Sequence, residues 1–314
     1  MVRLKFFLLF VLLSACTKEV NIPIPGFEEQ LVVEGRIETD GFPLIVLSKS
    51  ANIYESTDLE SYINSFIEDA IVQLSDGENS VLLEATLISE LPVQSIFRMA
   101  EIFDLEPEEV VLLPIKVFTT SDVLFQGKVG HRYDLQITYN GEEIEASTFI
   151  LSPVALDSVF WLPTEDNTEY GTSWARLSDP LGVFNAYRWE VKRVNLKNGQ
   201  EKDLVFKSPR NGFFSDDFID GQSIQFDYPN PMKRKDSTHL SEFKRYYRLN
   251  DTVVVKFSTM DDAVFEYFRT KRAQIVSSND PFATPINVRS NLTGPALGIW
   301  AGFSPSYDTL ICTP

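Results

Sequence analysis

Chemistry that needs a thiol or an imidazole rests on four side chains of this sequence, Cys16, Cys312, His131 and His239. Two histidines are too few for a multi-histidine metal site, and no cysteine or second histidine lies near His131 in the chain. His131 precedes a predicted strand, which is more typical of an exposed strand-entry residue than of a ligand. We therefore predict no metal site and no bound cofactor, and Cys16 is the residue with the most informative surroundings.

Cys16 ends a segment that is typical of a secretory signal. Arg3 and Lys5 precede an apolar run, Phe6–Leu13, which is too short to span a bilayer, and small residues follow it. Leu-Ser-Ala-Cys at 13–16 resembles the lipobox of bacterial lipoproteins, in which the cysteine sulfur accepts a lipid and begins the mature chain. The alternative is a buried N-terminal helix, but nothing upstream of it is available for packing.

This interpretation divides the start of the chain into two segments and places the protein in the cell envelope. Residues 1–15 are predicted to be a lipoprotein signal peptide. Residues 16–30 are polar and contain proline, so they are predicted to be a tether. The lipid on Cys16 is then the attachment to the membrane.

Charge limits the possible partners. The sequence of 314 residues has a net charge of −17, and loss of the two basic residues of the signal leaves 26 basic against 45 acidic residues, near −19. Nucleic acid requires a basic surface, so it is excluded as a partner. Anionic lipid does not attract such a chain, so the lipid on Cys16 has to hold it at the membrane. Once Cys16 carries lipid, Cys312 has no partner for an intramolecular disulfide.

The sequence contains no catalytic motif, and we predict a protein that is not an enzyme. Neither histidine lies in a recognisable nucleophile motif. The 45 acidic residues allow many imagined carboxylate pairs for glycan hydrolysis, but spacing along the chain cannot show two carboxylates facing each other. A deep cleft with facing carboxylates and raised pKa values would favour a hydrolase.

Four aspartates lie in an aromatic-rich stretch, and they form either a calcium site or a solvated acidic loop. These residues are Asp216, Asp217, Asp220 and Asp227. Their spacing lacks the alternating ligands and closing glutamate of a calcium loop, so a solvated acidic loop is the favoured interpretation.

The strand pattern predicts a mainly β protein. Aliphatic runs at Leu31–Glu38 and Leu44–Leu47 flank a turn, and Asn140-Gly141 is the strongest hairpin signal in the chain. A mature chain of this length exceeds the usual size of one core. We therefore predict two β-sandwich-like domains, residues 31–152, immunoglobulin-like, and residues 153–314.

Each predicted domain has one helical feature. Residues 89–114 break the β pattern, and apolar residues at helical spacing over Val93–Phe103 predict a partly helical insertion. This insertion is either a contact surface for a partner or a lid over an open sheet edge, and the lid is favoured. In the second domain, Thr259 is predicted to cap a helix near 260–277 that packs against the sheet.

Several stretches together resemble a known family. They are the lipobox, LVVEGRIE at 31–38, KVGHRYDLQI at 128–137, NDTVVVKFSTMDDAVFEYF at 250–268 and PFATPINVRSNLTGPALGIWAGFS at 281–304. With these residues the chain resembles a family of Bacteroidota lipoproteins, domain of unknown function 4249, over nearly its whole mature length. The resemblance implies an all-β, exported outer-membrane lipoprotein, often encoded beside TonB-dependent receptors. It supplies no catalytic residue, and Cys16 alone is carried over, as the lipid attachment site.

The same resemblance implies a possible modification. Bacteroidota attach O-glycans at Asp-Ser or Asp-Thr followed by a small or aliphatic residue, a pattern that occurs here at Ser158, Ser237, Thr252 and Thr309. Average composition predicts roughly one such match by chance, and an acidic residue before a β-branched one is also a common strand start. O-glycosylation is therefore a hypothesis, which the intact mass of the protein tests.

The functional prediction is an outer-membrane-anchored lipoprotein that serves as a non-catalytic accessory or binding partner of a TonB-dependent transporter in nutrient uptake. The alternatives are a structural or adhesive surface lipoprotein and a carboxylate-dependent glycan hydrolase. Trp161, Trp174, Phe184 and Trp189 either line a ligand surface or form core, and core is the commoner role. The leaflet that the protein faces, periplasmic or external, stays open.

Overall fold

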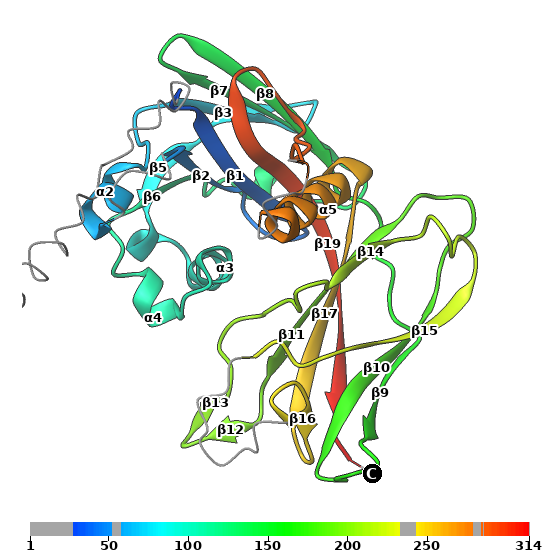
Figure 1. The fold of residues 1–314 in the computed structure, drawn as a ribbon. Helices are drawn as coiled ribbons and strands as arrows, with labels where there is room; N and C mark the ends of the chain where they lie inside the picture. Colours follow the sequence, from blue (N-terminus) through cyan, green and yellow to red (C-terminus); the bar gives the residue numbers. More distant parts are fainter. Residues whose placement is uncertain (1–27, 52–57, 233–242, 279–283, 285, 314) are drawn as a thin grey trace, which may run out of the picture.

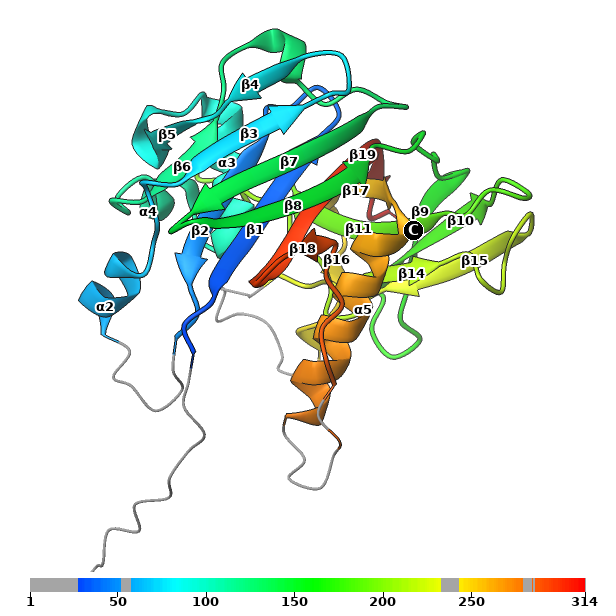
Figure 2. The ribbon, with the colours of Figure 1, turned by 90° about the horizontal axis from the view of Figure 1, so that it is seen from above.

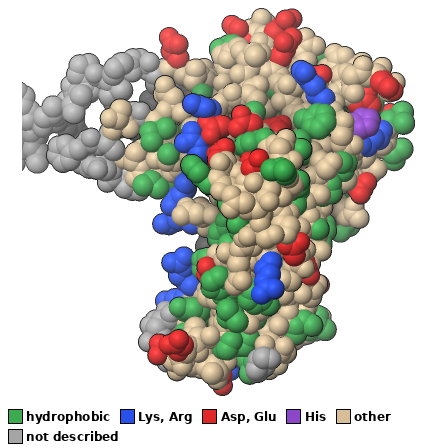
Figure 3. All heavy atoms as spheres, turned by 90° about the vertical axis from the view of Figure 1, so that its right-hand side faces the viewer, with side chains coloured by type: hydrophobic (Ala, Val, Ile, Leu, Met, Phe, Trp, Pro, Cys, Tyr) green, Lys and Arg blue, Asp and Glu red, His purple; other side chains and the backbone are tan. Residues whose placement is uncertain are grey.

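The computed structural model describes residues 28–51, 58–232, 243–278, 284 and 286–313 (Figure 1). Cys16, the signal peptide, Ser237 and His239 lie outside the described residues, as does most of the predicted tether. The fold is mainly β, as predicted, and consists of two β-sandwich-like units. On the face shown in Figure 3, acidic side chains gather over the upper part of the molecule, in keeping with the negative net charge.

One long sheet runs through both units. Among the described residues it has eight strands, in the order β14-β11-β17-β19-β1-β2-β6-β5. Their bounds are Leu31–Glu38 (β1), Leu44–Lys49 (β2), Glu84–Leu87 (β5), Lys116–Thr119 (β6), Ala186–Arg193 (β11), Phe213–Ser215 (β14), Thr252–Met260 (β17) and Ala296–Ile311 (β19).

Strand β19 joins the two units (Figure 1). Its first half, Ala296–Phe303, pairs in parallel with β1, and its second half, Ser304–Ile311, pairs antiparallel with β17. The prediction assigned all of 153–314 to the second domain. In the structure, the first half of β19 lies instead in the unit formed by the N-terminal strands, because its apolar residues complete that core.

A five-stranded sheet covers β1 and β2 to form the first sandwich (Figure 2). Its strands are β18 (Leu292–Thr293), β8 (Glu142–Phe149), β7 (Arg132–Tyr139), β3 (Ile71–Ser75) and β4 (Ser80–Leu82). The core between the layers includes Ile37, Tyr133 and Trp300, all fully buried. The indole Nε1 of Trp300 donates to the Tyr133 carbonyl at 3.0 Å, so this buried donor is satisfied.

The second sandwich is closed by a smaller sheet, and its core is rich in aromatic rings. This sheet contains β9 (Ser158–Pro163), β10 (Tyr170–Ser178), β15 (Ser223–Tyr228) and β16 (Tyr247–Arg248). A separate short hairpin, β12 (Leu196–Lys197) with β13 (Gln200–Glu201), follows β11. Trp161 and Trp189 are buried in this core, as the favoured interpretation predicted. Trp174 is half-buried and Phe184 is 36% exposed, so neither belongs to it.

The predicted insertion is partly helical, and it covers a face of the sheet rather than an edge. It contains α3 (Val93–Phe103), α4 (Pro107–Val110) and the short turn η1 (Ile88–Glu90). Met99 and Ala100 pack with Leu44 and Val46 on the side of β2 that faces away from the first core. The prediction of a lid over an open sheet edge is therefore wrong, because the insertion covers a face of the sheet.

The predicted helix near 260–277 is α5 (Asp262–Ser277), but its cap is not Thr259. Thr259 lies within β17, and Asp261 is the N-cap, since its side chain accepts from the Val264 amide at 2.9 Å. Asp261 also accepts from Thr148 Oγ1 and the Phe149 amide, both at 3.0 Å. The remaining short elements are α2 (Leu59–Asn64) and η2 (Val123–Phe125).

Candidate functional site

Strand alternation places several charged side chains on the face of the long sheet opposite the sandwich cores. In β1, Val33 and Ile37 face the first core, so Arg36 and Glu38 point the other way. In β11, Trp189 faces the second core and Glu190 does not. Such residues normally face water, but here α3 lies over them.

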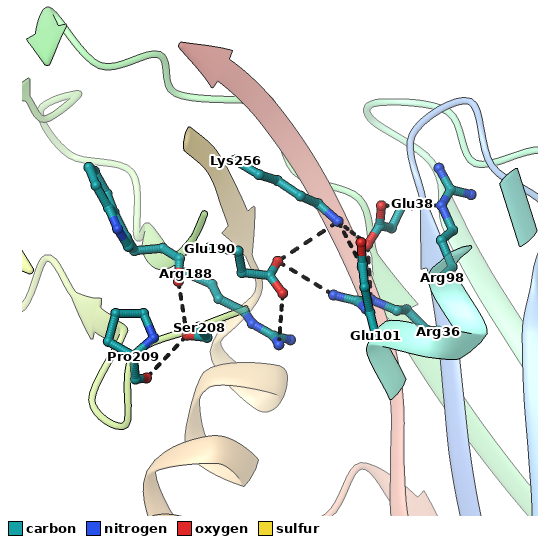
Figure 4. A network of polar contacts seen from close by, with 10 residues as sticks. Arg36, Glu38, Arg98, Glu101, Arg188, Glu190, Ser208, Pro209 and Lys256 are labelled. Atoms are coloured by element: carbon teal, nitrogen blue, oxygen red, sulfur yellow. Dashed lines mark hydrogen bonds and ion pairs between the residues drawn. The ribbon is translucent and has the colours of Figure 1, made fainter. Parts of the chain in front are cut away.

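Seven side chains form what we call the charge cluster (Figure 4). They are Arg36 and Glu38 of β1, Arg98 and Glu101 of α3, Arg188 and Glu190 of β11, and Lys256 of β17. Four are cationic and three are carboxylates, so the cluster carries one net positive charge when all seven are ionised.

Lys256 lies among all three carboxylates. Its Nζ is 2.9 Å from Glu38 Oε1, 3.6 Å from Glu101 Oε2 and 3.8 Å from Glu190 Oε2, and its side chain is 3% exposed. Glu190 is also its direct cross-strand neighbour between β11 and β17. The strand register thus sets one of these pairs, and the tertiary fold sets the other two.

Arg36 makes a second set of contacts with the same carboxylates. Its Nε is 2.9 Å from Glu38 Oε1, and its terminal nitrogens are each 3.6 Å from Glu101 or Glu190. Arg188 lies 2.9 Å from Glu190. Arg98 lies 3.5 Å from Glu38 and approaches from α3. Figure 4 shows Lys256 and Arg36 converging on the carboxylates from β17 and β1, the two strands that flank β19.

The ion pairs leave hydrogen-bonding capacity unused. Within the described part of the chain, these buried atoms have no hydrogen-bond partner of good geometry: Arg36 Nε and Nη2, Glu38 Oε2, Glu101 Oε2 and Glu190 Oε2. Buried polar atoms are usually satisfied by protein or water. The cluster therefore has both spare donors and spare acceptors.

The carboxylates of the cluster differ in acidity. Burial opposes ionisation of Glu38, but Lys256 and Arg36 outweigh it and hold the pKa of Glu38 well below its usual range. For Glu101, burial dominates, and with Glu190 and Glu38 nearby it raises the pKa despite Lys256. Burial also disfavours charge at Lys256, yet the three carboxylates raise its pKa.

Four of the seven cluster residues, two cations and two carboxylates, line a cleft of about 560 Å³ between the insertion and the second unit. Glu38, Glu101 and Lys256 line its base, and Phe97, Phe206 and Tyr307 are among its walls. A smaller pocket of about 160 Å³ lies on the other side of Glu101, beside Arg36, Arg188 and α5. The larger cleft is of a size that holds a small molecule.

Of the candidate site residues singled out from the sequence, none that the structure describes lies in this cleft. Ser158 and Thr252 are half-buried in strands and Thr309 is exposed, and their modification stays a prediction. His131 is exposed at the entry to β7, as predicted. Cys312 is fully buried, and burial raises the pKa of its thiol to about 12.

Sequence patterns gave one unused signal for the charge cluster. Lys256 interrupts an apolar strand, Val253–Ser258, and Arg36 and Glu38 do the same in β1. A single charged residue in such a strand is compatible with a face that is exposed to solvent. Only the position of α3 in the structure shows that these charges are buried.

The predicted acidic loop is more compact than a solvated loop. Asp216 and Asp220 converge with Asp179, with one carboxylate oxygen of each within 4.8 Å of the others. Asp179 accepts from the Tyr187 hydroxyl and the Gly221 amide, and backbone amides of residues 185 and 182 donate to Asp216 and Asp220. These hydrogen bonds account for the close approach of the three aspartates, so we assign no metal to them.

Together, fold and cleft define a mainly β protein in which an inserted helix buries charge at the junction of two sandwiches. The chain belongs to the family described as Domain of unknown function (DUF4249), whose model matches residues 17–306. No curated protein matches the sequence. Of the helices in the described residues, none has the length and apolar character needed to span a bilayer.

Proposed function

We propose that this protein is a lipid-anchored binding protein of the outer membrane that acts as a non-catalytic accessory of a TonB-dependent transporter. The observation that carries the binding role is the cleft of about 560 Å³ over the charge cluster. The lipobox at Cys16 supports the anchor. The transporter partnership rests on what the family resemblance implies.

The pairing within the cleft favours binding over chemistry. Lys256 contacts three carboxylates within 3.8 Å, so its amine is not a free nucleophile. Glu38 is held ionised by Lys256 and Arg36, and its Oε1 already accepts a hydrogen bond at 2.9 Å from Lys256. A floor whose charges neutralise one another suits recognition without bond cleavage.

Affinity extraction tests the proposal. The chain, tagged at its C-terminus, is extracted in mild detergent from native membranes and its companions are identified by mass spectrometry. We expect acylated Cys16 and a near-stoichiometric β-barrel receptor. Cys16→Ala is the control, which should leave the membrane fraction and lose the receptor. Recovery of the acylated chain alone would refute the transporter role and favour the structural or adhesive alternative.

One observation favours a second candidate, a carboxylate-dependent glycan hydrolase. Glu38 and Glu101 line the same cleft, and their pKa values are shifted in opposite directions. Such a pair is the pattern of a general acid beside an ionised partner. Release of reducing sugar by the wild type, abolished in Glu101→Gln and Glu38→Gln, would establish this activity. We expect no turnover in any of the three proteins.

A further inference from the structure

The floor of the cleft is ion-paired, but some of its buried polar atoms have no hydrogen-bond partner. Of the atoms without hydrogen-bond partners in the described chain, Glu38 Oε2, Glu101 Oε2 and Thr39 Oγ1 belong to residues that line the cleft. Arg36 lies 2.9 Å from Glu38 and does not line this cleft, so its nitrogens face the carboxylates rather than a ligand. A ligand that suits this floor must therefore donate to the carboxylates, and it can accept from the Thr39 hydroxyl.

The arrangement of charge argues against an ionic ligand. Cations and carboxylates alternate at 2.9–3.8 Å, so the floor has no separate positive or negative pole. A carboxylate or ammonium on the ligand would have to displace a buried partner, which is unfavourable because the displaced charge is left unpaired. A hydroxyl group donates and accepts without displacing a charge.

The walls supply flat apolar surfaces. Phe97 comes from α3, whereas Phe206 and Tyr307 come from the second unit, and the last two rings lie 6.1 Å apart at 52°. The Nζ atoms of Lys192 and Lys256 lie 5.5 and 5.6 Å from the Phe206 ring centre. Ring faces above a hydrogen-bonding floor match a ligand with C–H faces and a rim of hydroxyls.

From these three features we infer that the cleft binds an uncharged polyhydroxylated ligand, a short saccharide. The inference rests on the proposed binding role but not on the transporter. It assigns the floor residues Glu38, Glu101 and Lys256 to the hydroxyls, and the exposed ring of Tyr307 to the C–H face of the sugar.

Ligand-observed NMR on the full mature chain tests the inference with defined probes. The probes are neutral trisaccharides of several linkages, zwitterionic triglycine and anionic trigalacturonate, each at roughly millimolar concentration. We expect saturable binding of at least one neutral trisaccharide and none of the two charged probes. Tyr307→Ala should weaken that binding about tenfold through loss of stacking.

Tyr62→Ala is the matched control, because Tyr62 is 47% exposed and Tyr307 is 59% exposed, and Tyr62 lies in α2, outside the cleft. It should leave the affinity unchanged. Binding of only the charged probes, no binding of any neutral trisaccharide, or equal loss in the two variants would overturn the inference. Co-purification of a receptor without saccharide binding would refute the proposed ligand class alone. Saccharide binding without co-purification of a receptor would refute the transporter role alone.

Discussion

Lys256 is the residue on which the charge cluster depends most, because it contacts all three carboxylates. We expect Lys256→Met to lower the free energy of unfolding by about 3–5 kcal/mol, since it leaves buried carboxylates short of a cation. Urea denaturation followed by circular dichroism measures the change.

Lys116→Met is the control for that variant. Lys116 also pairs with a carboxylate, 2.8 Å from Glu68, but both side chains are more than a third exposed. Its loss should cost only about 0–1 kcal/mol. Equal effects of the two substitutions would mean that the cluster is solvated rather than buried.

Glu101 gives the cluster a distinctive pH dependence. Its pKa is raised by burial, with the neighbouring carboxylates adding to the effect, so the folded state holds its proton more tightly than the unfolded state does. The contribution of Glu101 to stability therefore falls as the pH rises from the unfolded pKa through the folded pKa. Glutamine at this position cannot ionise.

We accordingly expect Glu101→Gln to be more stable than the wild type at about pH 8, and the difference to disappear at about pH 4. The lowered pKa values of Glu38 and Glu190 make both proteins less stable as the pH falls, and this effect cancels in the comparison. Denaturation curves across this pH range measure the difference. A constant difference at every pH would show that Glu101 does not titrate abnormally.

Among the elements, the parallel pair β1–β19 requires glycine at one position. Gly298 has φ +111°, and a Cβ there would lie 1.9 Å from the Val33 carbonyl oxygen. We expect Gly298→Ala to destabilise the protein by more than about 3 kcal/mol, because the strands must separate. Gly141→Ala is the matched control: φ is +83° but the space is open, so strain of about 1 kcal/mol remains. Similar melting temperatures for the two variants would refute the tight pairing.

Local sequence patterns predicted where helices and strands form better than they predicted which of these elements pack together. Asn140-Gly141 does form a hairpin turn, with positive φ at both residues, and Val93–Phe103 is a helix. The β1–β19 pairing joins residues more than 260 positions apart, and no local pattern encodes such a contact. In the same way, the alternation of side chains along β11 predicts the face of the sheet on which Glu190 lies. It does not predict that α3 covers this face, so the cleft could not be predicted.

At the scale of the whole molecule, the two sandwiches share more than a linker. Strand β19 contributes to both cores through Trp300 and Leu310. The insertion also reaches the second unit, since Lys207 Nζ donates to Asp104 Oδ1 at 2.7 Å and Val205 is buried against the insertion. Opening either sandwich therefore disturbs the sheet and the charge cluster that both units build.

Cys312 reports whether this coupling holds. It is buried in the second core, and it is the remaining thiol once Cys16 is replaced by alanine. We expect a thiol reagent to label it only through unfolding. Val33→Ala, in the first core, should then speed labelling as much as Val255→Ala in the second. Each increase in rate should correspond to a loss of about 1–3 kcal/mol in the free energy of unfolding. If Val33→Ala left the labelling rate unchanged, the second sandwich would open alone, and the predicted division at Pro153 would describe two independent folding units.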